Sequence, residues 1–165
     1  MKYKLPLIVV ADISVSRKFY EVVLNQKVIM DFGANITFAG DFALQSKETW
    51  VKFIHKSESK ILPKSNNFEL YFEEERFDEF VKRLKSIEIE YVHEVVEYPW
   101  GQRVVRFYDP DMHIIEVGES METVVKRFLS QGLSAEETAE RTQHPIEFIM
   151  ACSLEGGIIN NIIPP

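Results

Sequence analysis

The chain has 165 residues, of which 45% are hydrophobic and 27% are charged, and these values are ordinary for one compact globular domain with a small appendage. Its net charge of −7 argues against a nucleic-acid or an anionic membrane surface as partner, and no apolar stretch approaches the roughly 20 residues of a transmembrane helix. The single cysteine, Cys152, excludes an intrachain disulfide, so we expect a cytoplasmic protein.

The first elements follow a β-α-β-β-β order. Residues 4–10 are apolar and β-branched and predict a strand, after which Asp12 is a typical N-cap for a helix over residues 13–24. Turn signals at Gly33 and Gly40 separate three short predicted strands, at 27–33, 35–40 and 42–46.

The same order then recurs. Residues 47–66 are polar and lysine-rich, and we interpret them as a connecting segment with one helical turn around Trp50 to Ile54. Alternation of Phe68, Leu70 and Phe72 predicts the next strand. A helix over 76–87 and strands at 89–97, 102–109 and 113–119 complete a second β-α-β-β-β unit. The sequence therefore contains an internal repeat of one supersecondary unit.

The C-terminal stretch has a different pattern. It predicts three short helices, the second opened by a Ser134–Glu137 capping box and the third by Pro145. The spacing is similar to a helix-turn-helix, but residues 121–155 carry six Glu against three Lys or Arg, which disfavours DNA binding. We expect a packing or dimerisation appendage, because more apolar side chains are present than three short helices can bury: Phe128, Leu129, Phe148, Ile149 and Met150.

Two motifs carry a family resemblance. The first is Asp12, Ser16, Phe19 and Tyr20 in the first helix, and the second is "PWGQRVVRFYDPDMHIIEVGE" at the end of the repeat. Together with the doubled unit, they resemble the vicinal oxygen chelate superfamily of glyoxalase I, extradiol dioxygenases, and fosfomycin- and bleomycin-resistance proteins. The resemblance covers about residues 3–120. It implies an α+β fold in which two βαβββ modules form a cup-shaped mixed sheet.

The resemblance also implies domain boundaries and metal positions. We expect a domain over 1–120 with modules at about 1–47 and 66–120, a helical extension over 121–155 and a tail over 156–165. The family's metal-ligand positions fall at Leu5, Gln45, Asn67 and Glu116. A leucine cannot bind a metal, and amide oxygens are poor ligands for zinc or nickel. We therefore expect no cofactor, with a divalent metal only if this register is wrong.

Glu116 nevertheless needs a partner, because a carboxylate among apolar strand residues is costly unless it is paired. Alternation along the strands, with the family's ligand-contacting positions, places Arg106 on the same cup face. Two interpretations stay open: a structural salt bridge left by a lost metal site, or a site in which Arg106 binds an anionic or carbonyl ligand and Glu116 orients it. His93 and His113 are interpreted as structural.

The expected cup lining is therefore mostly polar, with aromatic rings that can stack on a flat ligand. It comprises Gln45, Asn67, Glu69, Tyr71, Trp100, Arg106 and Glu116. The turn around Gly101 is expected to be anchored by Arg103. We predict a metal-independent binding protein for a small organic molecule, acting as a homodimer without nucleic-acid or membrane partners. The alternative is a lyase, isomerase or dioxygenase-type enzyme with Glu116 as the candidate catalytic residue.

Overall fold

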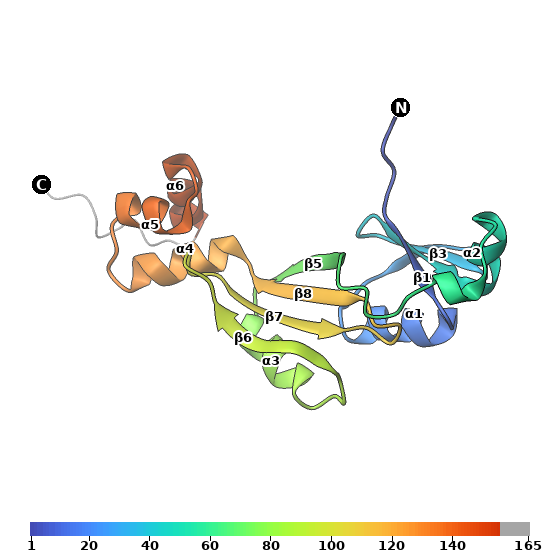
Figure 1. The fold of residues 1–165 in the computed structure, drawn as a ribbon. Coiled ribbons are helices and arrows are strands. Elements are labelled where there is room, and N and C mark those ends of the chain that lie inside the picture. The colour runs from blue at the N-terminus through green and yellow to red at the C-terminus, as the bar shows by residue number, and fades with distance from the viewer. Residues whose placement is uncertain (156–165) are drawn as a thin grey trace, which may run out of the picture. The chain divides into compact units, whose positions relative to one another are not determined.

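The structure of the protein is a computed structural model that describes residues 1–155, so the expected tail over 156–165 lies outside the described residues. The chain forms two compact units (Figure 1). The first comprises residues 1–69 with 108–114, and the second comprises residues 70–107 with those from 115 onward. Each of the two sheets has four strands, and the predicted doubled βαβββ pattern and α+β class are confirmed.

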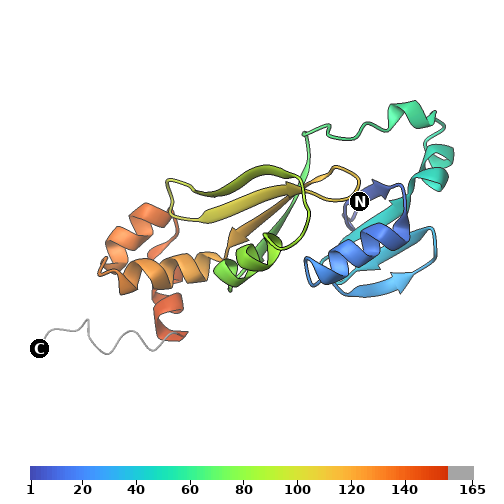
Figure 2. The same ribbon diagram turned by 90° about the horizontal axis from the view of Figure 1, so that it is seen from below.

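The first sheet has the strand order β1-β4-β3-β2, with β1 parallel to β4 and the other pairs antiparallel. Figures 1 and 2 show its helix lying along one face. The Asp12 carboxylate caps that helix by accepting hydrogen bonds from the N–H groups of Ser14 and Val15, as predicted. The elements are β1 (Leu7–Val10), α1 (Ile13–Val22), β2 (Val28–Asp31), β3 (Asn35–Phe38) and β4 (Phe42–Ser46).

The two motifs behind the family resemblance meet along α1. The buried Tyr20 hydroxyl donates to Asp109 (2.8 Å), and the Ser16 hydroxyl donates to Asp111 (2.8 Å). Asp111 also accepts a hydrogen bond from the N–H of Ala11 (2.7 Å). These bonds hold the turn that follows β7 against α1 within the first unit, so residues far apart in the sequence form one motif.

The connecting segment is more helical than we predicted. It contains α2 (Lys47–Phe53) and a short 3-10 helix, η1 (Glu58–Lys60), instead of one turn around Trp50 to Ile54. The helix α2 has seven residues and buries none of them, so its apolar residues, Trp50, Val51 and Phe53, span too few turns to establish a helical period. Exposed ion pairs, Glu48–Lys52 along the helix and Lys47–Glu58 across the segment, support it instead (both 2.7 Å).

The second sheet repeats the topology with the order β5-β8-β7-β6. Its first strand begins at Glu69, so Phe68 and Asn67 precede it and the prediction that they belong to the strand is wrong. Phe68 is 48% exposed, which shows that it contributes little to this sheet's core. The elements are β5 (Glu69–Glu74), α3 (Phe77–Leu84), β6 (Tyr91–Glu97), β7 (Arg103–Tyr108) and β8 (Ile114–Glu119).

Three helices follow β8: α4 (Met121–Ser130), α5 (Ala135–Thr142) and α6 (Ile146–Glu155). The predicted capping box at Ser134 and Glu137 is confirmed. The helices bury Phe128, Leu129 and Ile149 in two clusters within the second unit, so the expectation that these three side chains stay uncovered is wrong. Of the residues expected to be exposed, Met150 is 45% exposed. No helix among the described residues is long and apolar enough to cross a membrane.

Candidate functional site

The second sheet has one face covered by α3 and an opposite face, which we call the distal face. Phe107 packs near Phe80 of α3 (6.3 Å between ring centroids), and the Arg103 guanidinium lies over the ring of Phe77 (5.3 Å). Alternation along β7 therefore turns Val104 and Arg106 toward the distal face. Glu116 on the neighbouring strand β8 shares that face, because it forms an ion pair with Arg106.

Arg106 is the centre of a compact cluster on the distal face. Besides its ion pair with Glu116, it donates a hydrogen bond to the Tyr98 hydroxyl (2.5 Å), and its guanidinium lies 5.8 Å from the centroid of that ring. Its Nη1 also lies 3.2 Å from Nε2 of His93. Because the His93 Nδ1 donates to the carbonyl of Glu94 (2.7 Å), Nε2 accepts from Arg106 in the neutral ring. We call Arg106, Glu116, His93 and Tyr98 the Arg106 cluster.

A second hydrogen-bonded group lies beside it. The Gln102 amide donates to the Tyr71 hydroxyl (2.7 Å) and accepts from the Trp100 indole N–H (3.1 Å). Burial, reinforced by the bond from Tyr71 to Glu73, raises the pKa of Tyr71 to about 12, so this phenol stays protonated at neutral pH. The sequence interpretation missed Gln102, because one amide at a strand end carries no pattern.

The aromatic side chains of the site stand on a turn that α4 holds in place. Trp100 stacks on Tyr98 with ring centroids 4.6 Å apart, and the turn closes through a bond from the N–H of Gly101 to the carbonyl of Tyr98 (2.8 Å). Gly101 has a φ of +86°, and a Cβ there would collide with the ring of Phe128. The anchor is Arg127, which donates to the carbonyl of Gly101 (2.5 Å), and not Arg103 as expected.

Arg103 instead pairs with a buried carboxylate that the sequence interpretation did not single out. The Glu119 side chain is 0% exposed and accepts from Arg103 (3.0 and 3.1 Å) and from Arg127 (3.0 Å). Burial raises the pKa of Glu119, but the hydrogen bonds from the two arginines outweigh it and the net pKa is lowered. Arg103 also pairs with Asp78 of α3 (2.8 Å). Glu119 therefore ties α4 to the sheet.

The remaining predicted site residues belong to the first unit. The Gln45 side chain is buried on β4; it accepts from Asn35 (3.0 Å) and donates to the carbonyl of Ala34 (3.0 Å) and to Thr49 (2.5 Å). Asn67 and Glu69 are exposed, and Asn67 accepts a bond from Ser65 (2.9 Å). The structure thus brings Arg106 to Glu116, and Tyr71 to Trp100 through Gln102. These four predicted residues belong to the candidate site in the second unit.

Comparison with known proteins shows which family has this fold. The family model for the glyoxalase-like domain matches residues 3–122. The chain belongs to this family. A search of curated proteins gave no match. Among solved structures, the glyoxalase-like protein is similar to a protein of unknown function from Agrobacterium tumefaciens str. C58, with 35% identity, a TM-score of 0.64, and coverage of 73% of this chain and 94% of that one.

More distant structures share the fold. A lactoylglutathione lyase from Agrobacterium tumefaciens is 19% identical, with a TM-score of 0.55 and coverage of 73% of this chain and 96% of its own. The fosfomycin resistance protein FosX from Mesorhizobium loti is 16% identical, with a TM-score of 0.51 and coverage of 77% and 97%. The match to the glyoxalase-like family model confirms the predicted superfamily. At these identities, the likeness to the lyase and to FosX concerns the fold alone.

Proposed function

We propose that this glyoxalase-like protein binds a small organic molecule at the Arg106 cluster without using a catalytic metal. The observation that carries the proposal is the ion pair between Arg106 and Glu116. The family resemblance gives Glu116 the position of a metal-binding glutamate. Here the protein's own arginine neutralises that carboxylate, so the cluster offers a positioned guanidinium instead of an open carboxylate.

The other family positions supply no donor set that fits a metal. Leu5 has no donor atom, and the Gln45 amide is engaged by three protein groups. Asn67 lies in the loop before β5 and offers an amide, which is a weak ligand for zinc or nickel. No group of three or more His, Cys, Asp or Glu side chains that could hold a metal ion occurs among residues 1–155.

The cluster suits a ligand that carries a carbonyl or carboxylate next to an apolar body. The Arg106 side chain is 20% exposed, and its bonds to Tyr98 and His93 hold the guanidinium in one orientation. Val96 lies directly opposite Val104 in the register of β6 and β7, so it shares the distal face, and it is 39% exposed. A polar anchor beside an apolar surface is the usual composition of a small-molecule site.

The proposal is tested by measuring the binding of benzoate, a simple aromatic carboxylate. We expect ligand-observed NMR to detect benzoate binding to the wild-type protein, weaker binding to Arg106→Lys, which keeps the charge but loses the planar fork, and none to Arg106→Leu. Arg17→Leu is the matched control, because Arg17 lies on α1 in the first unit and its loss leaves benzoate binding unchanged. Equal binding to Arg106→Leu and wild type, or a stoichiometric transition metal retained through dialysis, contradicts the proposal.

An enzymatic function is the second candidate, and one contact favours it. A substrate that takes over Arg106 releases Glu116, which is 9% exposed, as a carboxylate that can accept a proton. This is the chemistry of a lyase or isomerase. A substrate whose turnover disappears in Glu116→Gln, while its binding and the protein's unfolding free energy persist, identifies the protein as an enzyme. If the wild-type protein binds the molecule but does not convert it, the result supports the binding function proposed above.

We further propose that the protein is a homodimer. In addition to the family expectation of a cup built from two modules, the edge strand β6 carries three exposed valines: Val92, Val95 and Val96, which are 40%, 37% and 39% exposed. An apolar edge strand is a liability in a monomer and favours association.

A further inference from the structure

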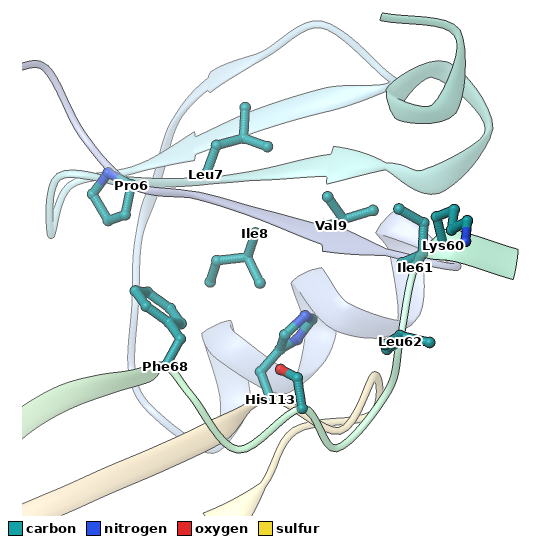
Figure 3. A pocket seen from close by; sticks show the side chains of 10 residues that line it. Pro6, Leu7, Ile8, Val9, Lys60, Ile61, Leu62, Phe68 and His113 are labelled. Carbon is teal, nitrogen blue, oxygen red and sulfur yellow. The ribbon is translucent and has the colours of Figure 1, made fainter. Parts of the chain in front are cut away.

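A pocket lies in the first unit, at the edge strand β1. Its volume is about 580 Å³, within the range of small-molecule pockets. Figure 3 shows Ile8, Phe68 and Leu62 on the same side of β1 as the ring of His113. Leu62 and Phe68 are 70% and 48% exposed, so large apolar side chains here have little protein against them. The pocket shares no residue with the Arg106 cluster.

His113 is the imidazole in this pocket, and its orientation is determined by a buried carboxylate. Asp109 is 2% exposed, and its Oδ2 accepts from the His113 Nδ1 (2.9 Å) and the Tyr20 hydroxyl (2.8 Å). Its Oδ1 accepts from the N–H groups of Asp111 (2.9 Å) and His113 (2.8 Å). With Nδ1 donating, the neutral ring presents Nε2 as an acceptor.

The acceptor at Nε2 is available to a ligand. The His113 side chain is 25% exposed, and no hydrogen bond to Nε2 is found within the described part of the chain. The loop that carries the lining residue Ser65 is also held in place, because the neighbouring Asn66 accepts a bond from the Tyr108 hydroxyl (2.8 Å) and Lys64 lies over the Tyr108 ring (5.3 Å). A largely apolar pocket with an oriented acceptor at Nε2 therefore exists before any ligand arrives, which lowers the ordering cost of binding.

We propose that this pocket binds a small apolar molecule with a single hydroxyl group, of the phenol class. The hydroxyl donates to Nε2 of His113, and the ring packs against Leu62 and Phe68. The pocket is also lined by Lys60 and Ser65, but His113 is the lining side chain whose acceptor is oriented by a buried carboxylate, so it sets the orientation of the ligand while apolar contact supplies most of the affinity. The inference stands independently of the proposed function at Arg106.

The experiment compares phenol with anisole, which has the same ring but no hydroxyl donor. In NMR titrations of the full chain, wild type is expected to bind phenol about fivefold more tightly than anisole, the value of one net hydrogen bond. His113→Leu is expected to remove that preference while anisole still binds. His55→Gln, an exposed histidine of the same unit, is the matched control and keeps the preference.

Two further variants keep the proposal falsifiable if His113→Leu disturbs the turn. Leu62→Ala, at a 70% exposed position, weakens phenol and anisole by similar factors without a folding defect. Arg106→Leu leaves both affinities unchanged, so failure here is distinguishable from failure of the proposed function. Equal affinities for the two probes in wild type, a phenol preference that survives in folded His113→Leu, or no saturable binding of either probe overturns the proposal.

Discussion

The ion pair between Arg106 and Glu116 can be tested by a double-mutant cycle. The variants are Arg106→Leu, Glu116→Leu and the double variant, because leucine keeps much of the side-chain volume while removing the charge. Glu116→Gln is added as a polar substitution of the same shape. If the pair stabilises the fold, removing one partner leaves the other charge largely buried, whereas removing both does not.

The expected magnitudes follow from exposure and from the remaining partners. Arg106→Leu leaves the 9% exposed Glu116 carboxylate without its cation. Breaking a fully buried pair costs about 3–5 kcal/mol of unfolding free energy. Because the arginine side chain is 20% exposed, we expect a loss of about 2–3 kcal/mol here. Glu116→Leu leaves Arg106 bonded to Tyr98 and His93, so we expect about 1–2 kcal/mol. The coupling free energy is then about 1–2 kcal/mol.

The assay is urea unfolding at constant ionic strength, read from one tryptophan. The chain has two tryptophans, Trp50 and Trp100, so a Trp50→Phe background reports on the second unit alone. The exposed Arg76–Glu79 pair, three residues apart in the same unit, is the matched control, with an expected coupling of about 0.3–0.5 kcal/mol. Additive effects at Arg106 and Glu116 would refute the pairing argument. A nearly neutral Glu116→Gln with lost ligand binding would move Glu116 from a structural to a functional role.

Three other predictions follow from the second unit. Glu119→Gln is expected to cost about 2–4 kcal/mol, because both arginines lose a buried carboxylate. Because folding lowers the pKa of Glu119 from 4.5, its carboxylate contributes its full stabilisation above pH 4.5 and loses it as the pH falls through the folded-state pKa. The difference in unfolding free energy between wild type and Glu119→Gln therefore shrinks at low pH. Urea titrations that show the same difference at every pH contradict this. Gly101→Ala is expected to cost about 2–4 kcal/mol of unfolding free energy, because the new Cβ meets both a positive φ and the ring of Phe128. The control Gly132→Ala has a φ of +94° but no neighbour within 4 Å, so we expect it to cost about 1 kcal/mol. Equal melting temperatures for the two variants would disprove the contact with Phe128. Light scattering is expected to give twice the chain mass at micromolar concentration, and a monomer would rule out the proposed dimer.

The sequence by itself determined the order of the elements, because strand alternation, helical periodicity and caps depend on neighbours along the chain. Asp12 and the Ser134–Glu137 box are local signals of this kind, and both form as predicted. Alternation, together with the ligand-contacting positions that the family resemblance implies, also predicted the Arg106–Glu116 contact. Where a helix spans only about two turns, as α2 does, the same reasoning underestimated its length.

Only the tertiary structure decided which charged and apolar groups are buried. Glu119 looked like an ordinary strand end until folding brought Arg103 and Arg127, 16 and 8 residues away, to its carboxylate. Phe128 looked available for an interface, but it packs against the turn at Gly101. A side chain is buried by the residues that pack against it, and these come from distant parts of the chain. Periodicity in the sequence can therefore show which face of a helix or strand is apolar, but not which part of the protein covers that face.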